Sequence, residues 1–157
     1  MDLREHLVLR AAAAAAQALS YRNFRVGCAV YAWKPWREGD DLANYLGARW
    51  RVFTGANLKP DPDTQKFCAE RSAINASRSA GYTKIIGFAV VGKPQPDDES
   101  GLTHSTLHPC GVCRRTLGAL PEVSGETRVL TGSPQDQDIL VHEFSFEELL
   151  ALHGTRI

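Results

Sequence analysis

Residues 85–91 read IIGFAVV, a continuous apolar run rich in β-branched and aromatic side chains. Such a run predicts a central strand that is covered on both faces of its sheet. The segment before it, residues 68–80, is expected to form a helix that ends at Gly81. A second short helix is expected at 111–120, because Pro121 follows and cannot continue it. The central strand therefore lies between two helices in the chain.

The N-terminal part of the chain predicts one helix and two strands. Leucine and alanine recur at helical spacing over residues 3–19, and alanine is the best helix former. Strands are expected at 24–33 and 49–54, the second followed by Gly55 as a turn residue. Residues 34–48 between them contain proline, glycine and several charges, and they are too many for a tight hairpin turn. This segment is therefore expected to be a surface loop.

The C-terminal part predicts a long loop, two strands and a last helix. Residues 93–109 hold three prolines, and a loop of this length is expected to border an active site. Strands are expected at 127–131 and 139–144, and their short connection favours an antiparallel pair. Residues 146–152 close the chain as a helix.

This order of elements, α-β-β-α-β-α-β-β-α, predicts an α/β fold. Strands that alternate with helices indicate a three-layer α/β/α arrangement around one mixed five-stranded sheet. A chain of 157 residues suits one compact domain, so a single domain over residues 1–157 is expected. The apolar fraction of 43% is ordinary for a globular protein and predicts a true core.

The charge balance disfavours a nucleic acid polymer as partner. Eighteen basic residues face eighteen acidic ones, whereas neutralising phosphates calls for a basic excess. A small-molecule substrate is expected instead. The apolar N-terminal stretch from Leu7 to Leu19 is interrupted by Arg10 and Gln17, and no stretch has the length needed to cross a bilayer. We therefore expect a soluble, cytoplasmic protein without a membrane partner.

Three of the four cysteines form a pattern typical of catalytic zinc. Cys68 opens one expected helix, while Cys110 and Cys113 stand in a C-x-x-C spacing at the start of the next. Three thiolates fill three corners of a tetrahedral Zn²⁺ site, and the open fourth corner holds water. Helix N-termini also favour thiolates, because free backbone N–H groups and the helix dipole stabilise negative charge there.

Acidic and basic residues beside these cysteines predict the rest of the chemistry. Glu70, two residues after Cys68, can take a proton from the water and pass it to a ring nitrogen and a departing amine. This combination is the signature of zinc nucleobase deaminases. Three thiolates leave net negative charge on the site, which a neighbouring cation should offset. Arg71 and Arg114 are the candidates for that supporting role.

The same residues also have possible uses other than catalytic zinc. A C-x-x-C pair can be a redox pair or half of a structural zinc site. A structural site needs a fourth ligand, for which Cys28 is available, but Cys28 lies in an apolar strand where buried free cysteine is common. His104 and His108 are weaker ligand candidates. They are four residues apart, a spacing that places two side chains on one face of a helix, but they lie in an expected loop. The other histidines are expected to be ordinary surface or strand residues: His6, His142 and His153.

Five stretches of the sequence resemble the cytidine deaminase family, in its small form with three cysteine ligands. They are YRNFRVG at 21–27, VFTGAN at 52–57, CAERSAI at 68–74, PCGVCR at 109–114 and EELL at 147–150. The two stretches with cysteine are highly specific and the others are supportive. The resemblance covers most of the chain.

The resemblance implies a role for individual residues. It makes Cys68, Cys110 and Cys113 the zinc ligands, Glu70 the proton shuttle and Arg71 a partner of the ligand sulfurs. It also implies substrate contacts for four residues: Phe24 against the base, Asn57 on the sugar, the Ala69 N–H on the ring carbonyl, and the His108 carbonyl on the amino group. Enzymes of this family are usually homotetramers, so a homo-oligomer is expected.

One departure from the family pattern opens an alternative. The family commonly has Asn-x-Glu where this chain has Asn57-Leu58-Lys59, and lysine has no acceptor for a ribose hydroxyl. The sequence therefore predicts a deaminase of cytidine or deoxycytidine, with a modified aminopyrimidine of the blasticidin S type as the alternative. A non-catalytic, zinc-stabilised binding module is the alternative of another class.

Overall fold

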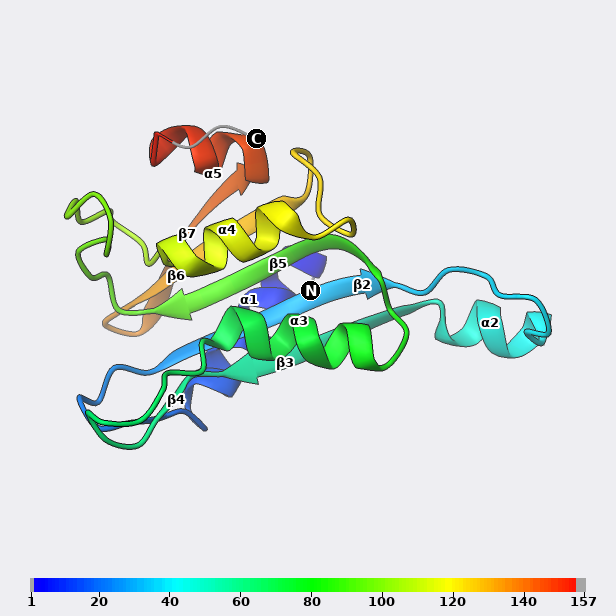
Figure 1. Ribbon diagram of the computed structural model, residues 1–157, viewed down its shortest axis with the longest axis horizontal. Helices are drawn as coiled ribbons and strands as arrows, with labels where there is room; N and C mark the ends of the chain where they lie inside the picture. The colour runs from blue at the N-terminus through cyan, green and yellow to red at the C-terminus, as the bar shows by residue number, and fades with distance from the viewer. Residues whose placement is uncertain (1, 155–157) are drawn as a thin grey trace.

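The computed structural model describes residues 2–154 and contains a mixed five-stranded sheet (Figure 1). The strands, in spatial order, are β3 (Trp50–Ala56), β2 (Val26–Trp33), β5 (Lys84–Gly92), β6 (Arg128–Gln135) and β7 (Asp138–Ser145). Only β5 and β6 are parallel neighbours, and the other adjacent strands are antiparallel. The expected mixed sheet and the expected antiparallel pair at the C-terminus are confirmed.

Helices cover both faces of this sheet (Figure 1). On one face, α1 (Leu3–Ala15) packs across β2 and β5. On the other face lie α3 (Ala69–Ser79), α4 (Gly111–Ala119) and α5 (Phe146–Leu152). The three-layer α/β/α prediction is therefore correct. Local signals fix the helix starts: the Asp2 side chain caps α1, and Ser145 with Glu148 forms a capping box at α5.

Strand alternation divides the core into two clusters. In β2, Cys28 and Val30 face the α3 side while Ala29 faces α1, as period-2 geometry requires. The central strand β5 is buried along nearly its whole length, with Phe88 at 0% exposure. The apolar run at 85–91 is therefore the doubly covered strand that its composition predicts.

Gly55 corrects one expectation. It lies inside β3 and not in a turn. A side chain at this position would collide with the backbone of Ala69 and Ala73, so the missing Cβ lets α3 approach the sheet closely. This close approach sets the position of the N-terminal end of α3.

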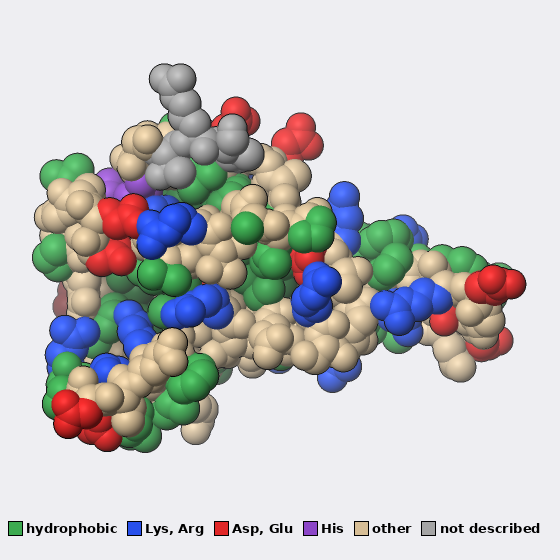
Figure 2. All heavy atoms as spheres, viewed as in Figure 1, with side chains coloured by type: hydrophobic (Ala, Val, Ile, Leu, Met, Phe, Trp, Pro, Cys, Tyr) green, Lys and Arg blue, Asp and Glu red, His purple; other side chains and the backbone are tan. Residues whose placement is uncertain are grey.

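The segment 34–48 also differs from its expectation as a plain loop. It contains the helix α2 (Leu42–Ala48), which projects from the body of the molecule (Figures 1 and 2). Asp41 caps this helix through a bond from the Asn44 N–H. None of its residues is buried, so no apolar stripe facing the core marked it in the sequence. A two-residue parallel pair, β1 (Leu19–Ser20) with β4 (Leu58–Lys59), was missed as well.

Within residues 2–154, no helix combines the length and the apolar character that crossing a membrane demands. The alanine-rich α1 instead buries Leu7, Val8 and Ala11 against the sheet.

Candidate active site

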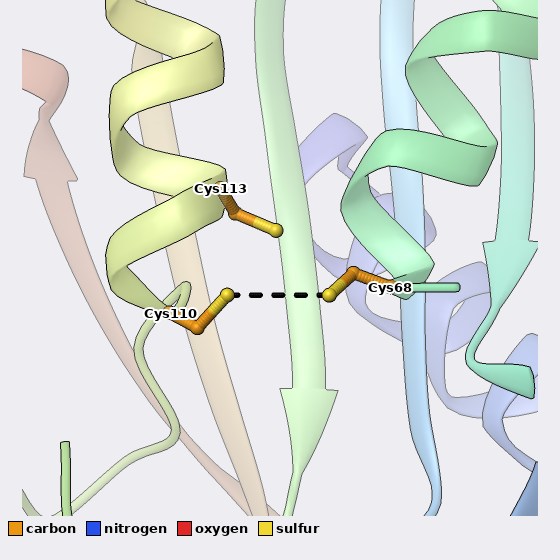
Figure 3. A group of neighbouring side chains, drawn as sticks. All are labelled: Cys68, Cys110 and Cys113. Carbon is orange, nitrogen blue, oxygen red and sulfur yellow. Dashed lines mark hydrogen bonds between the residues drawn. The ribbon is translucent and has the colours of Figure 1, made fainter. Parts of the chain in front are cut away.

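Three cysteines converge between the N-terminal ends of two helices (Figure 3). Cys68 is the N-cap residue of α3, and Cys110 is the N-cap residue of α4. Cys113 lies one turn into α4 and is fully buried. The sulfurs of Cys68 and Cys110 are 4.0 Å apart, and the three sulfurs all lie within 4.8 Å of one another. The sequence spacing therefore translates into one compact donor set.

The electrostatics of the three thiols are strongly coupled. The pKa of Cys68 is lowered by hydrogen bonds from the thiols of Cys110 and Cys113 and from the Arg71 guanidinium. The pKa of Cys113 is raised by its hydrogen bonds to Cys110 and Cys68, by burial and by the Glu70 carboxylate. Three neighbouring sulfurs therefore cannot all ionise unless a cation offsets their charge.

The donor set fits a metal ion. Soft thiolates suit zinc, and helix N-termini add partial positive charge toward the sulfurs. Arg71 Nη2 donates to Cys68 Sγ at 3.1 Å, the kind of supporting contact that stabilises a sulfur ligand. Cys28 stands apart as a fully buried free thiol on β2, and burial raises its pKa. The group of Cys68, Cys110 and Cys113 could therefore hold a metal without Cys28.

Glu70 lies in the first turn of α3, directly after the ligand candidate Cys68 and Ala69. Its side chain lines a small inner cavity of about 50 Å³ together with Cys68 and Cys110. The residue is 4% exposed, and this burial raises the pKa of its carboxyl group above the usual range. A carboxyl group with a raised pKa next to a metal donor set is suited to exchanging protons.

The inner cavity opens beside a larger outer cavity of about 560 Å³, and Phe24, Lys66 and His108 line both. Residues of the 93–109 loop form one wall of the outer cavity, so this loop borders the cavity beside the three cysteines.

All four residues expected to contact the substrate line the inner cavity: Phe24, Asn57, Ala69 and His108. The side-chain amide of Asn57, however, is engaged by the backbone. Its Oδ1 accepts from the Val26 N–H at 2.8 Å and its Nδ2 donates to the Phe24 carbonyl at 2.7 Å. Asn57 therefore holds the start of β2 in place and retains one donor for another partner.

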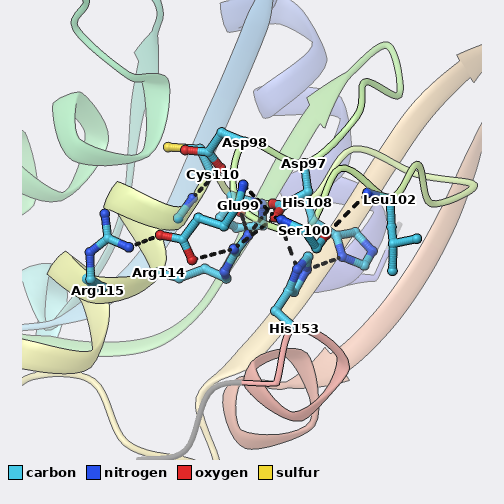
Figure 4. Close-up of polar contacts among 12 residues, drawn as sticks. Asp97, Asp98, Glu99, Ser100, Leu102, His108, Cys110, Arg114, Arg115 and His153 are labelled. Carbon is cyan, nitrogen blue, oxygen red and sulfur yellow. Dashed lines mark hydrogen bonds and ion pairs between the residues drawn. The ribbon is translucent and has the colours of Figure 1, made fainter.

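Arg114 contacts acidic side chains of the 93–109 loop, Asp97 and Glu99 (Figure 4). It is 2% exposed, and its Nη1 donates to the Pro109 carbonyl and to Asp97 Oδ1, each at 2.7 Å. Its hydrogen bonds reach no cysteine sulfur within residues 2–154. Arg114 thus links the loop residue Asp97 to the backbone just before Cys110. Its positive charge is paired with the Asp97 carboxylate.

The buried Asp97–Arg114 pair gives a testable contribution to stability. Burial works to raise the pKa of Asp97, but hydrogen bonds from Arg114 and from the Ser100 N–H hold it well below its usual range. Replacing Asp97 with alanine is expected to cost about 3 kcal/mol in the free energy of unfolding, because the buried Arg114 charge loses its closer carboxylate partner and keeps only the 3.4 Å contact with the half-exposed Glu99. Urea unfolding at neutral pH measures this, with Asp63→Ala on an exposed loop as the control.

The pH dependence of this contribution follows from the depressed pKa. The stabilisation from Asp97 is fully present above its unfolded pKa, about 3.9. It is lost as the pH falls toward the lower folded-state value. The Asp97→Ala variant should therefore differ most from the wild type near neutrality and converge with it in acid. An unchanged difference at low pH would show that the ion pair is not its origin.

The sequence did not predict that two further residues, Asp97 and His153, lie near the site. Asp97 stood in a loop with no motif around it. His153, expected to be an ordinary residue, has a side chain only 1% exposed, and its Nε2 lies 2.9 Å from His108 Nδ1. The partners of both are far away in the chain, so no local pattern signals them.

Comparisons with known proteins point in one direction. The cytidine deaminase of Halalkalibacterium halodurans is 29% identical over 99 residues, which are 63% of this chain and 64% of that protein. The match thus spans slightly less than two thirds of that relative. The cytidine deaminase of Mycoplasma genitalium is 28% identical over 130 residues, covering 83% of this chain and 78% of that protein. No family model matches the chain.

The fold gives the same result. The crystal structure of cytidine deaminase from Burkholderia pseudomallei superposes with a TM-score of 0.66 at 28% identity. This similarity covers 95% of this chain and 96% of that one.

Proposed function

Because the chain belongs to the cytidine deaminase family by sequence and by fold, we propose that residues 1–157 form one zinc-dependent hydrolytic deaminase domain. Its substrate is a cytosine nucleoside, cytidine or deoxycytidine. Water replaces the exocyclic amino group, and the products are the uracil form of the nucleoside and ammonia.

One observation carries the proposal: the three sulfurs of Cys68, Cys110 and Cys113 converge beside the buried carboxyl group of Glu70. A purely structural metal site needs neither a buried carboxyl group nor a cavity next to its ligands. A deaminase needs both, since it must move protons and hold a ring.

Zinc held by the three cysteines would supply a Lewis acid that makes a water molecule acidic enough to attack at neutral pH. Glu70 takes the proton that this water loses. It delivers this proton to the ring nitrogen, then takes the second proton from the hydroxyl group added to the ring carbon and passes it to the departing amine, so that the C–N bond breaks and ammonia leaves. The burial that raises the pKa of Glu70 brings it closer to neutrality, which suits a group that must both accept and donate.

The remaining cavity residues position the base. Phe24 offers an aromatic surface for the ring, and the Ala69 N–H at the start of α3 is a donor for the ring carbonyl. The His108 carbonyl, just before Pro109, is the acceptor for the amino group. Arg71 withdraws charge from Cys68 through its 3.1 Å contact. Asn57 holds the backbone at Phe24 and Val26 beside the cavity and has one N–H left for the sugar.

Turnover of cytidine by zinc-loaded protein tests the proposal. The expected result is the release of one ammonia per cytidine consumed, with the change in ultraviolet absorbance that accompanies conversion to uridine. A fully zinc-loaded protein without turnover on either cytidine or deoxycytidine contradicts the proposed substrate.

A second candidate substrate is a modified aminopyrimidine of the blasticidin S type, favoured by the position of Lys59. Its Nζ donates to the backbone carbonyls of Pro62 and Thr64, so it closes the loop after β4 and does not line either cavity. Position 59 therefore offers no carboxylate that could accept a hydrogen bond from a ribose hydroxyl. A panel of cytidine, deoxycytidine, cytosine and blasticidin S, compared by kcat/KM, separates the two candidates.

A homotetrameric assembly and a cytoplasmic location remain predictions. Light scattering after size-exclusion chromatography tests the first, and subcellular fractionation of the source cells tests the second.

A further inference from the structure

We propose that His104, His108 and His153 form a second site for a divalent transition metal ion, separate from the three-cysteine site. The two groups share no residue, and their donors differ in kind: imidazole nitrogens in one and thiol sulfurs in the other. The second site goes beyond the proposed deaminase activity, which does not require it.

The three imidazoles lie within reach of one ion. His108 Nδ1 and His153 Nε2 are 2.9 Å apart, and the rings of His104 and His108 are stacked with centroids 4.2 Å apart. One nitrogen from each of the three residues lies within 4.8 Å of the others. A tetrahedral ion with bonds of about 2.0–2.1 Å to nitrogen separates its ligands by roughly 3.4 Å. The nitrogens lie near this spacing, and binding requires the His104 ring to turn out of its stack on His108 so that both lone pairs point at one ion.

Unsatisfied ring nitrogens support the proposal. His104 Nε2 and His153 Nδ1 are buried and have no hydrogen-bond partner in the described part of the chain. The His153 side chain is 1% exposed, so water does not readily supply one. A buried polar atom without a partner destabilises the folded protein. An ion bound through His104 Nε2 would satisfy that atom directly, and an ion on His153 Nε2 would orient the ring so that its Nδ1–H can turn toward Asp97.

Asp97 provides the support that histidine ligands usually have. Its Oδ1 lies 3.8 Å from His153 Nδ1, the ring nitrogen that does not contact His108 (Figure 4). A metal-bound histidine generally donates its other ring N–H to a carboxylate, which fixes its tautomer and orientation. Asp97 is itself held by Arg114, so this carboxylate is fixed in place.

The chemistry of the donors selects the class of ion. Imidazole suits Zn²⁺, Cu²⁺ and Ni²⁺, whereas Mg²⁺ and Ca²⁺ prefer oxygen. His104 and His108 line the outer cavity, which gives an ion a path to the cluster. In Figure 2, histidine side chains also reach the surface beside acidic ones, at the upper left of the molecule.

An ion in this place would join distant parts of the chain. His104 belongs to the 93–109 loop, and His153 is the C-cap residue of α5. The loop forms one wall of the outer cavity, so the ion would fasten that wall to the C-terminal helix. Metal binding here should therefore raise the thermal stability of the protein.

A titration of the metal-free protein with Co²⁺ tests the proposal. The wild type should bind two equivalents, and sulfur-to-cobalt charge-transfer absorption marks the one at the cysteines. His153→Ala and His104→Ala should each bind one equivalent and keep this absorption. His6→Gln, on α1 across the sheet, should still bind two. Cys68→Ala should lose the absorption and keep one equivalent, which makes failure of this site distinguishable from failure of the proposed zinc enzyme.

The second readout is the midpoint of thermal unfolding. The second equivalent of Co²⁺ should raise it in the wild type and leave it unchanged in His104→Ala, a variant that removes a partly exposed side chain. One equivalent in the wild type overturns the proposal, and so do two equivalents in either histidine variant.

Discussion

Replacing Glu70 with glutamine is expected to lower kcat by about 10³-fold, within the range of losses typical for a removed general acid–base. Glutamine keeps the shape of the side chain in its buried position but cannot exchange protons. The metal content should not change, because Glu70 lies outside the group of three sulfurs. Zinc analysis and steady-state kinetics on the same preparation measure both quantities.

The matched control is Glu126→Gln, which makes the same change on an exposed residue and should keep wild-type kcat. Unchanged turnover in Glu70→Gln would remove Glu70 from the mechanism. Loss of zinc together with turnover would assign Glu70 to the metal site. If the zinc-loaded wild type shows no turnover on the whole substrate panel, the alternative of a non-catalytic zinc-binding module is the better account.

Replacing Cys68 with alanine is expected to abolish zinc binding at the cysteine site and reduce activity to background. Two remaining sulfurs cannot complete the donor set, and the cost in affinity should exceed the roughly 100-fold loss seen when only a supporting residue is changed. Since metal affinity also stabilises the fold, the midpoint of thermal unfolding of the zinc-loaded protein should fall as well. Competition with a chromogenic chelator measures the affinity.

Cys28→Ala is the control for this change. It removes a cysteine that is equally buried but lies outside the group of three. It should lose some stability through the cavity it leaves, and it should keep its zinc and its activity. Equal loss of zinc in both variants would mean that Cys28 belongs to the metal site.

Local sequence signals were enough to predict most of the fold. The run at 85–91 became the central strand β5, and α5 occupies the expected residues 146–152. These elements are specified by features within a few residues, such as an unbroken apolar run or a capping box. The helix α2 was missed because it buries no residue and so lacks an apolar stripe. Gly55 was misplaced because its role depends on how closely a helix passes over it.

The candidate site likewise has features that the sequence predicts and others that it does not. The convergence of Cys68 with Cys110 and Cys113 could be predicted, because the chemistry of zinc restricts which residues and spacings can hold it. The contacts around them could not, since they join residues distant in the chain. The bond between Arg114 and Asp97 and the packing of His153 against His108 exist only once the loop and α5 have folded over α4.

X-ray absorption at the zinc edge, on protein reconstituted with one equivalent of Zn²⁺, tests the central claim most directly. The account predicts three sulfur neighbours and one lighter neighbour from the solvent. A fourth ligand from the polypeptide, or fewer than three sulfurs, would contradict a catalytic zinc held by Cys68, Cys110 and Cys113.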